Sequence, residues 1–309
     1  FTILRIIHDR VYFLPFACQP AIHNPIETWD RQDAFCFAGA YYVRYPDRTR
    51  DLENFIEALP GFRPLEIYDR NFGKDHPDYM FPDAYKPFIV GTLPPEQIDR
   101  AYKGYRFGIN LNSVKNSQTM FARRVYELLG SNTITVSNYS RGLRHMFGSL
   151  VISSDNGNEI LEQLQSADLD KLRLAGLRKV MSEHTYGARL NYVARKAGLT
   201  EEAYQLPPVT VLAHARNENE ALSLTAHFRR QEGVEAALLL VLDSSLAYLA
   251  GALEDHNIRT VPETEAAALL LEEAVGGGAW GACLTAADYY GPNYLRDLLL
   301  AHPQSEPKE

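Results

Sequence analysis

The chain has 309 residues, of which 46% are hydrophobic and 23% charged, a balance that excludes an intrinsically disordered protein. Its length allows two domains of ordinary size. The formal net charge is -8, so the long-range field of the chain opposes binding to nucleic acids or anionic membranes, and we expect neither as a partner.

Further features of the whole chain predict a cytoplasmic protein without a transmembrane segment. Cys18, Cys36 and Cys283 have no metal-binding spacing, and we interpret them as reduced core residues. The first ten residues lack the long apolar stretch and cleavage site of a signal peptide. No apolar run reaches the length that spans a bilayer.

Short apolar runs alternate with helical patterns up to residue 198, which predicts a parallel β-sheet covered by helices on both faces. We expect strands at 11–17, 34–41, 65–68, 88–90, 107–111, 133–137 and 150–153. We expect helices at 48–59, 95–102, 119–129 and 142–147, and over most of 159–198.

A second series of alternation follows Leu206-Pro207-Pro208, where the proline pair indicates a linker. Its strands are expected at 209–213, 237–242, 258–261 and 280–284, and its helices at 220–230, 245–255, 265–274 and 293–301. The fold class is therefore α/β. We predict a Rossmann-like domain over 34–205 and a second, smaller Rossmann-like domain over 206–309, preceded by a short segment, 1–33.

Three loops at the predicted carboxyl ends of strands are candidate ligand sites, because ligands of open parallel sheets bind there. In the first loop, Gly39 would let a ligand approach the backbone. Arg44 and Arg48 could hold a diphosphate by charge-assisted hydrogen bonds. Two ordinary surface arginines at a helix start explain the same pattern, and by themselves they are the commoner case.

The second loop leads into the predicted helix 119–129, whose free N–H groups would favour an anion. One apolar face of that helix is expected to consist of Met120, Phe121, Val125, Leu128 and Leu129. Arg123, Arg124 and Glu127 fall away from this face, and Glu127 could accept hydrogen bonds from ribose hydroxyls. Arg123 and Glu127 are also spaced as an i, i+4 ion pair, so a surface ion cluster explains them equally well.

The third loop, which contains Ser140, Arg141 and Gly142, completes an ordered set of segments that resembles a known family. The segments are 102–112, 119–129, 133–138, 140–143 and 184–186 with Arg189, and, upstream, 14–17 and 37–42. In this order they resemble the carboxyl-terminal domain of CgeB-like (spore-maturation) proteins, which are grouped with glycosyltransferases of the GT-B architecture. The resemblance covers roughly residues 10 to 198.

The resemblance implies that residues 34–205 are the donor-binding half of a GT-B fold and that residues 1–33 are a remnant of, or crossover from, its first domain. Glu127 would hold the nucleotide ribose, and Ser140, Arg141 and Gly142 would line the sugar or base pocket. The residues that would face the diphosphate are Gly39, Arg44, Arg48, Asn112 and Ser117, with Arg123 and Arg124 beside them.

Two departures from the family pattern limit what can be carried over. Many retaining GT-B enzymes have a second Glu eight positions before the ribose-binding one, where this chain has Thr119, so the catalytic residues and the stereochemistry stay open. The first GT-B domain normally supplies the acceptor site. We therefore expect the isolated chain to transfer sugar slowly or not at all, unless a partner chain or a second copy provides that surface.

The second domain resembles the start of a family 2-like GT-A glycosyltransferase, through 209–213, 216–218, 229–231, 242–245 and 288–295. GT-A enzymes hold a divalent cation with closely spaced carboxylates. Asp288 alone remains at the position where two or three are expected, so we interpret this domain as partial and degenerate and expect no metal site.

The leading hypothesis is a glycosyltransferase that moves a hexosyl group from a nucleotide sugar, its substrate, without a metal or other cofactor. The acceptor would be a glycan, a protein or a small molecule. The alternative is a non-catalytic module that binds a nucleotide sugar or a glycan, and a weaker one is a structural partner in a surface or coat assembly. Fold class alone does not separate these hypotheses.

Overall fold

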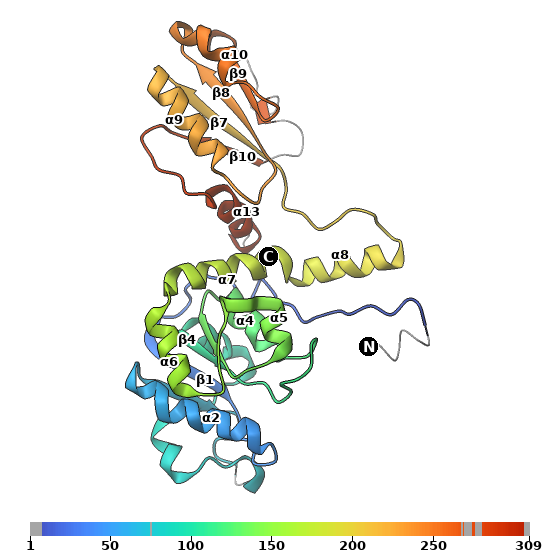
Figure 1. Cartoon of the computed structure of the whole chain (residues 1–309), viewed down its shortest axis with the longest axis vertical. Helices are drawn as coiled ribbons and strands as arrows, with labels where there is room; N and C mark the ends of the chain where they lie inside the picture. The colour runs from blue at the N-terminus through green and yellow to red at the C-terminus, as the bar shows by residue number, and fades with distance from the viewer. Residues whose placement is uncertain (1–7, 75, 267, 269–273, 276–279, 306–309) are drawn as a thin grey trace. The chain divides into compact units, whose positions relative to one another are not determined.

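The computed structural model describes residues 8–74, 76–266, 268, 274–275 and 280–305. The chain forms two compact units, Phe1–Ala203 and Tyr204–Glu309. Each unit has its own parallel sheet (Figure 1). Each also has its own hydrophobic core. The predicted α/β class, with a parallel sheet in each half of the chain, is confirmed.

The first unit is a six-stranded sheet in the order β3-β2-β1-β4-β5-β6, with every neighbouring pair parallel. Its strands are β1 (Gln32–Gly39), β2 (Leu65–Asp69), β3 (Ile89–Gly91), β4 (Tyr105–Asn110), β5 (Ile134–Ser137) and β6 (Ile152–Ser153). This is the Rossmann strand order, whose direction of progression reverses between β1 and β4. Ligands of such sheets bind at that reversal, beyond the carboxyl ends of the strands.

Helices and short 3-10 turns connect these strands. The helices are α2 (Pro46–Ala58), α3 (Asp99–Lys103), α4 (Arg124–Gly130), α5 (Arg141–Phe147), α6 (Gly157–Ser166), α7 (Leu169–Glu183) and α8 (Tyr186–Ala197). The 3-10 turns are Leu59–Gly61, Pro77–Tyr79, Asp83–Phe88, Pro95–Gln97 and Gly148–Leu150. Pro46 begins α2, where its missing N–H costs nothing.

The two faces of β1 explain how the helices pack on the sheet. Phe35 and Phe37 point to one face and join a core with the apolar residues of α2 and α6. The alternate residues of β1, Ala34, Cys36 and Ala38, are small and point to the other face, where α3 and α4 pack closely. Because both faces are buried, β1 is a continuous apolar run rather than an alternating one.

Two predicted elements of this unit differ from the structure. The predicted strand 11–17 is extended but joins no sheet; its continuation makes a single bridge, between Cys18 and Thr185. Leu14 and Phe16 are about half exposed, at 51% and 53%, so the apolar run reflects no buried face. The predicted helix 119–129 begins only at Arg124, and Met120, expected on its apolar face, is 58% exposed.

The second unit is a four-stranded parallel sheet in the order β10-β7-β8-β9. Its strands are β7 (Val209–Ala215), β8 (Ala236–Leu242), β9 (Ile258–Pro262) and β10 (Trp280–Leu284). Its helices are α9 (Glu218–Arg229), α10 (Ala250–Leu253), α11 (Glu263–Ala266) and α13 (Tyr294–Ser305), with a 3-10 turn at Ser244–Leu249. Most of the predicted helix 265–274 lies outside the described residues. Among the described helices, none has the length and apolar character needed to cross a membrane.

Arg189 and the backbone of the buried residue His184 hold the N-terminal segment against the rest of the first unit. Arg189 donates hydrogen bonds to the carbonyl oxygens of Pro15 (3.1 Å) and Phe16 (2.9 Å) and to Nδ1 of His184 (2.8 Å). The backbone of Cys18 donates to the His184 carbonyl at 2.9 Å. Burial, and next the charge of Arg189, lower the pKa of His184 from its ordinary 6.5 to about 4. The folded state therefore favours the neutral imidazole.

This lowered pKa predicts a loss of stability at acid pH. Because the unfolded chain binds the proton more readily, the stabilisation is complete above pH 6.5 and is lost as the pH falls towards 4. At pH 5 the free energy of unfolding of the first unit is expected to be roughly 2 kcal/mol lower than at pH 7.5 from this residue. Urea unfolding of wild type and His184→Asn at both pH values measures how much the free energy of unfolding changes with pH. The control His145→Gln, at an exposed histidine, should show the same change as wild type. An equal pH dependence in His184→Asn would contradict the assignment.

Candidate functional site

A cavity of about 360 Å³ lies at the reversal point of the first sheet. It is lined by the carboxyl end of β1 at Gly39, by residues that follow β2 and β4, and by the first turn of α4. Residues with charged side chains in the lining are Arg48, Arg70, Arg123, Arg124 and Glu127. Four guanidinium groups face one carboxylate, so the cavity is cationic although the whole chain is acidic.

Three of these arginines have no carboxylate partner within the described part of the chain: Arg48, Arg70 and Arg124. Arg48 is only 6% exposed; it donates to the Ala40 carbonyl at 3.1 Å, and its guanidinium lies 4.6 Å from the centre of the Tyr42 ring. Nε of Arg124 is buried and has no hydrogen-bond partner. Such donors favour an anionic ligand that satisfies them.

Electrostatics within the cavity support the same conclusion. Burial lowers the pKa of Arg48 to about 10, and the positive charges of Arg124 and Arg70 also act to lower it. A buried cation that is repelled by its neighbours gains free energy when an anion enters. Phosphate groups suit this site, because planar guanidinium groups bind phosphate oxygens in pairs.

The single carboxylate of the lining is held in a fixed position. Glu127 is 7% exposed; one of its oxygens accepts from Nε of Arg123 at 3.1 Å, and the other accepts from the Tyr102 hydroxyl at 2.9 Å. The i, i+4 ion pair suggested by the sequence therefore forms, and it forms in the cavity wall. The role of Glu127 in binding a ribose stays a prediction.

Other predicted site residues lie outside this cavity. Arg44 forms an ion pair with Asp78 at 2.5 Å, and three quarters of its side chain is exposed. The hydroxyl of Ser117 accepts from the backbone of Thr119 and Met120, at 3.3 and 3.0 Å, and so shapes the loop before α4.

The loop that begins α5 also lies outside the cavity. The Ser140 hydroxyl accepts from the backbone of Leu143 and caps α5. Arg141 lines a different hollow together with Arg144. Gly142 allows a close approach, since an added Cβ would lie 3.1 Å from the carbonyl oxygen of Ser117. The structure thus gathers Gly39, Arg48, Arg123, Arg124 and Glu127, and separates from them Arg44, Asn112, Ser117, Ser140, Arg141 and Gly142.

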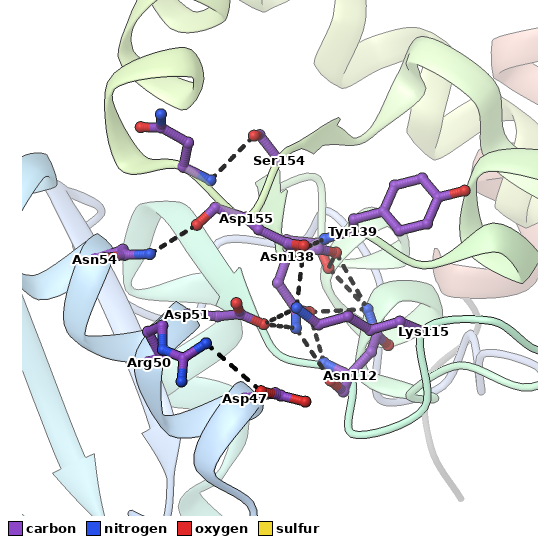
Figure 2. Close-up of polar contacts among 12 residues, drawn as sticks. Asp47, Arg50, Asp51, Asn54, Asn112, Lys115, Asn138, Tyr139, Ser154 and Asp155 are labelled. Carbon is purple, nitrogen blue, oxygen red and sulfur yellow. Dashed lines mark hydrogen bonds and ion pairs between the residues drawn. The ribbon is translucent and has the colours of Figure 1, made fainter.

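A buried polar network beside the cavity holds the loop between β4 and α4 (Figure 2). The Asn138 amide donates to Asp51 at 2.6 Å and accepts from the Asn112 backbone at 2.7 Å. Lys115 pairs with Asp51 at 2.6 Å and with Asp155 at 3.0 Å. Asn112 in turn accepts from the backbone of Ala122 at 2.9 Å, and Ala122 is followed by Arg123, the residue before α4. The network therefore positions the charged start of α4.

Several functional candidates were missed in the sequence. Arg70 immediately follows β2, so the rule about carboxyl ends of strands, applied to that strand, would have found it. Tyr42, Tyr68 and Tyr102 also line the cavity and provide apolar rings beside the arginines. Asp51 could also have been found, because an acidic residue on the buried face of a helix such as α2 indicates a buried polar contact.

Two aspartates in the segments of the second unit that resemble GT-A enzymes form hydrogen bonds within local turns. Asp243 accepts from the backbone and hydroxyl of Ser245 at 2.9 and 2.7 Å. Asp288 accepts from the Thr285 hydroxyl at 2.9 Å. Among the described residues, no three His, Cys, Asp or Glu side chains gather as a metal site.

The fold and cavity of the first unit define a Rossmann-type domain whose site is suited to a phosphorylated ligand. Residues 48–195 match the model of a family described as glycosyl transferase-like. The matched region runs from the first turn of α2 to the last turn of α8 and contains all the arginines of the cavity and Glu127. The match supports a glycosyltransferase-type domain, and hence a sugar donor and an acceptor. No curated protein shows a significant match to the chain.

Proposed function

We propose that this protein transfers a hexosyl group from a nucleotide-sugar donor and that the cavity between β1 and β4 binds the donor. The excess of unpaired arginines over carboxylates in this cavity is the observation that carries the proposal. Arg48, Arg70 and Arg124 would bind the diphosphate and stabilise the charge that develops on it as the glycosidic bond breaks. They would do so in place of a metal ion. Glu127 would accept hydrogen bonds from the ribose.

The finer assignments belong to the same proposal. The domain would be the donor-binding half of a CgeB-like GT-B enzyme, and another surface would complete the acceptor site, because proximity lowers the barrier only when both reactants are held. The second unit would be a degenerate GT-A-like domain without a metal. The nucleotide-sugar donors that bind the first unit would come from the cytoplasm.

A second candidate function is a non-catalytic module that binds a nucleotide sugar. One observation favours it: Glu127 is the single acidic group in the described lining, no histidine accompanies it, and both its oxygens already accept hydrogen bonds. The described lining thus offers no free group to accept a proton from an acceptor. A transferase would therefore take its proton acceptor from another part of the protein or from a partner, or would work without one.

Titration with nucleotide sugars tests the donor site. We expect at least one of the UDP, GDP and ADP sugars to raise the melting temperature at millimolar concentration, equally with EDTA and with Mg²⁺, since bound ligand stabilises the folded state by mass action. Glu127→Ala should weaken binding by about 1–3 kcal/mol, the cost of losing hydrogen bonds to a charged group. Glu162→Ala, a change of an exposed glutamate on α6, should have no effect.

The absence of any shift would reject the donor site, and a shift that requires Mg²⁺ and vanishes in Asp288→Ala would reject metal-independent binding. Product analysis with a panel of acceptors then separates the two functions. Multiple-turnover transfer supports the enzyme, whereas tight binding with neither transfer nor donor hydrolysis supports the binding module.

A further inference from the structure

Asp69, at the end of β2, is a buried carboxylate without a cation. The described residues include three buried carboxylates, Asp51, Asp69 and Glu127, with exposed fractions of 4%, 7% and 7%. Asp51 pairs with Lys115 and Glu127 with Arg123, whereas Asp69 accepts only the backbone N–H of Asn71, at 3.0 Å. One of its oxygens is thus left without a donor in the described structure. This oxygen is not among the side-chain atoms that are closed off from solvent without a partner, so it opens into the hollow that Asp69 lines, where a ligand can donate to it.

The Asp69 carboxylate lines a second cavity, of about 280 Å³, beneath the loop that follows β2. Phe72 and Tyr79 supply aromatic walls, and the Phe72 ring is 54% exposed although it lines a hollow. Lys74 and Lys86 also contribute to the lining. Partial burial raises the pKa of the Asp69 carboxyl group above its ordinary value.

The lining selects a class of ligand. Lys74 disfavours a cation, whereas Lys86 is already paired with Asp83. The Asp69 carboxyl group disfavours an anion next to it, so a neutral ligand fits best. A carboxyl group beside the Asn71 amide offers hydrogen bonds to hydroxyl groups. Exposed aromatic rings bind an apolar surface. A pyranose ring combines these features, since it has hydroxyl groups at its edge and C–H bonds on its face.

The second cavity adjoins the donor cavity. Tyr42 lines the first and Tyr79 the second, and their rings meet edge to face with centroids 5.5 Å apart. At the carboxyl end of β2 successive residues line different cavities. Tyr68 and Arg70, the residue after the strand, line the first cavity, and Asp69 between them lines the second. A ligand in the second cavity would therefore lie next to one bound by the arginines.

We propose that the cavity at Asp69 binds a pyranose ring of the acceptor, with Asp69 accepting hydrogen bonds from ring hydroxyls and Phe72 packing against the ring face. The acceptor role rests on the proposed transferase function, whereas the binding of a sugar ring here does not. The acceptor of this protein is then a carbohydrate, or a molecule that carries one.

Saturation-transfer NMR with the methyl pyranosides of glucose, galactose, mannose and N-acetylglucosamine tests the site. At least one glycoside should bind wild type, and Asp69→Asn should weaken that binding at least fivefold. The asparagine oxygen can still accept from the Asn71 backbone, so the turn after β2 is retained. Phe72→Ala removes an exposed ring and should weaken binding similarly without unfolding the chain. Phe16→Ala, at an equally exposed ring outside the cavity, should change nothing.

The same samples are titrated with nucleotide sugars, which keeps the two proposals apart. Glycoside binding that is lost in Asp69→Asn and Phe72→Ala, with nucleotide binding retained, supports the site. If no glycoside binds wild type, or if binding survives both substitutions, the proposal is overturned whatever the nucleotides do. If a glycoside binds as expected but no nucleotide sugar does, the sugar site stands and its acceptor role falls with the proposed function.

Discussion

Replacing Arg48 with methionine is expected to weaken the binding of the nucleotide-sugar donor by about 10- to 100-fold, the loss of one or two hydrogen bonds to a charged group. Arg48 is the most buried cation of the cavity and has no carboxylate partner, so its charge is available to the diphosphate. Methionine keeps the aliphatic part of the side chain. The measurement is isothermal titration with the nucleotide sugar that gives the largest thermal shift.

The matched control is Arg44→Met. Arg44 precedes the same helix but is paired with Asp78 and lies outside the cavity, so its loss should change affinity by less than about twofold. The stability of Arg48→Met should stay within about 1 kcal/mol of wild type, because the lost bond to the Ala40 carbonyl is offset by relief of repulsion among arginines. Equal effects of the two substitutions would place the diphosphate elsewhere.

Asn112→Ala is expected to lower the free energy of unfolding of the first unit by about 2–4 kcal/mol, the range for breaking a buried polar network. Asn112 is 2% exposed, and its side chain links the backbone of Ala122 to Ser137 and Asn138. Alanine leaves the Ala122 N–H without its acceptor and removes one donor each from Ser137 and Asn138, which keep their other partners. Because the loop then no longer fixes the start of α4, donor affinity should fall as well.

Urea unfolding measures this change, and Asn116→Ala is the control, since Asn116 lies in the same loop but is exposed. A cost below about 1 kcal/mol for Asn112→Ala, similar to the control, would show that the network does not hold the loop. A stability loss without any loss of donor affinity would separate the network from the site.

Part of the candidate site could be predicted because its residues follow strand ends. Gly39 and Arg48 were found by that rule, and Glu127 by its place on the helix after the second loop and then by the family resemblance. All three line one cavity. The same rule also selected Arg44, which lies shortly before Arg48 in the sequence but forms an ion pair with Asp78 outside the cavity. Local sequence does not distinguish two arginines whose partners lie in another loop.

The alternation of apolar runs with helical patterns by itself determined the α/β class and the parallel sheets, because strands buried on both faces and helices buried on one face leave different periodicities. The tertiary structure decided which side chains meet. Asn138 contacts Asp51 across 87 residues, and the loop that they hold delays α4 to Arg124. The fold likewise decides that the Asp69 carboxylate has no cation beside it, because the groups that surround it come from other segments of the chain. Periodicity records how each segment meets the core, whereas charge pairing and cavities depend on segments that only the fold brings together.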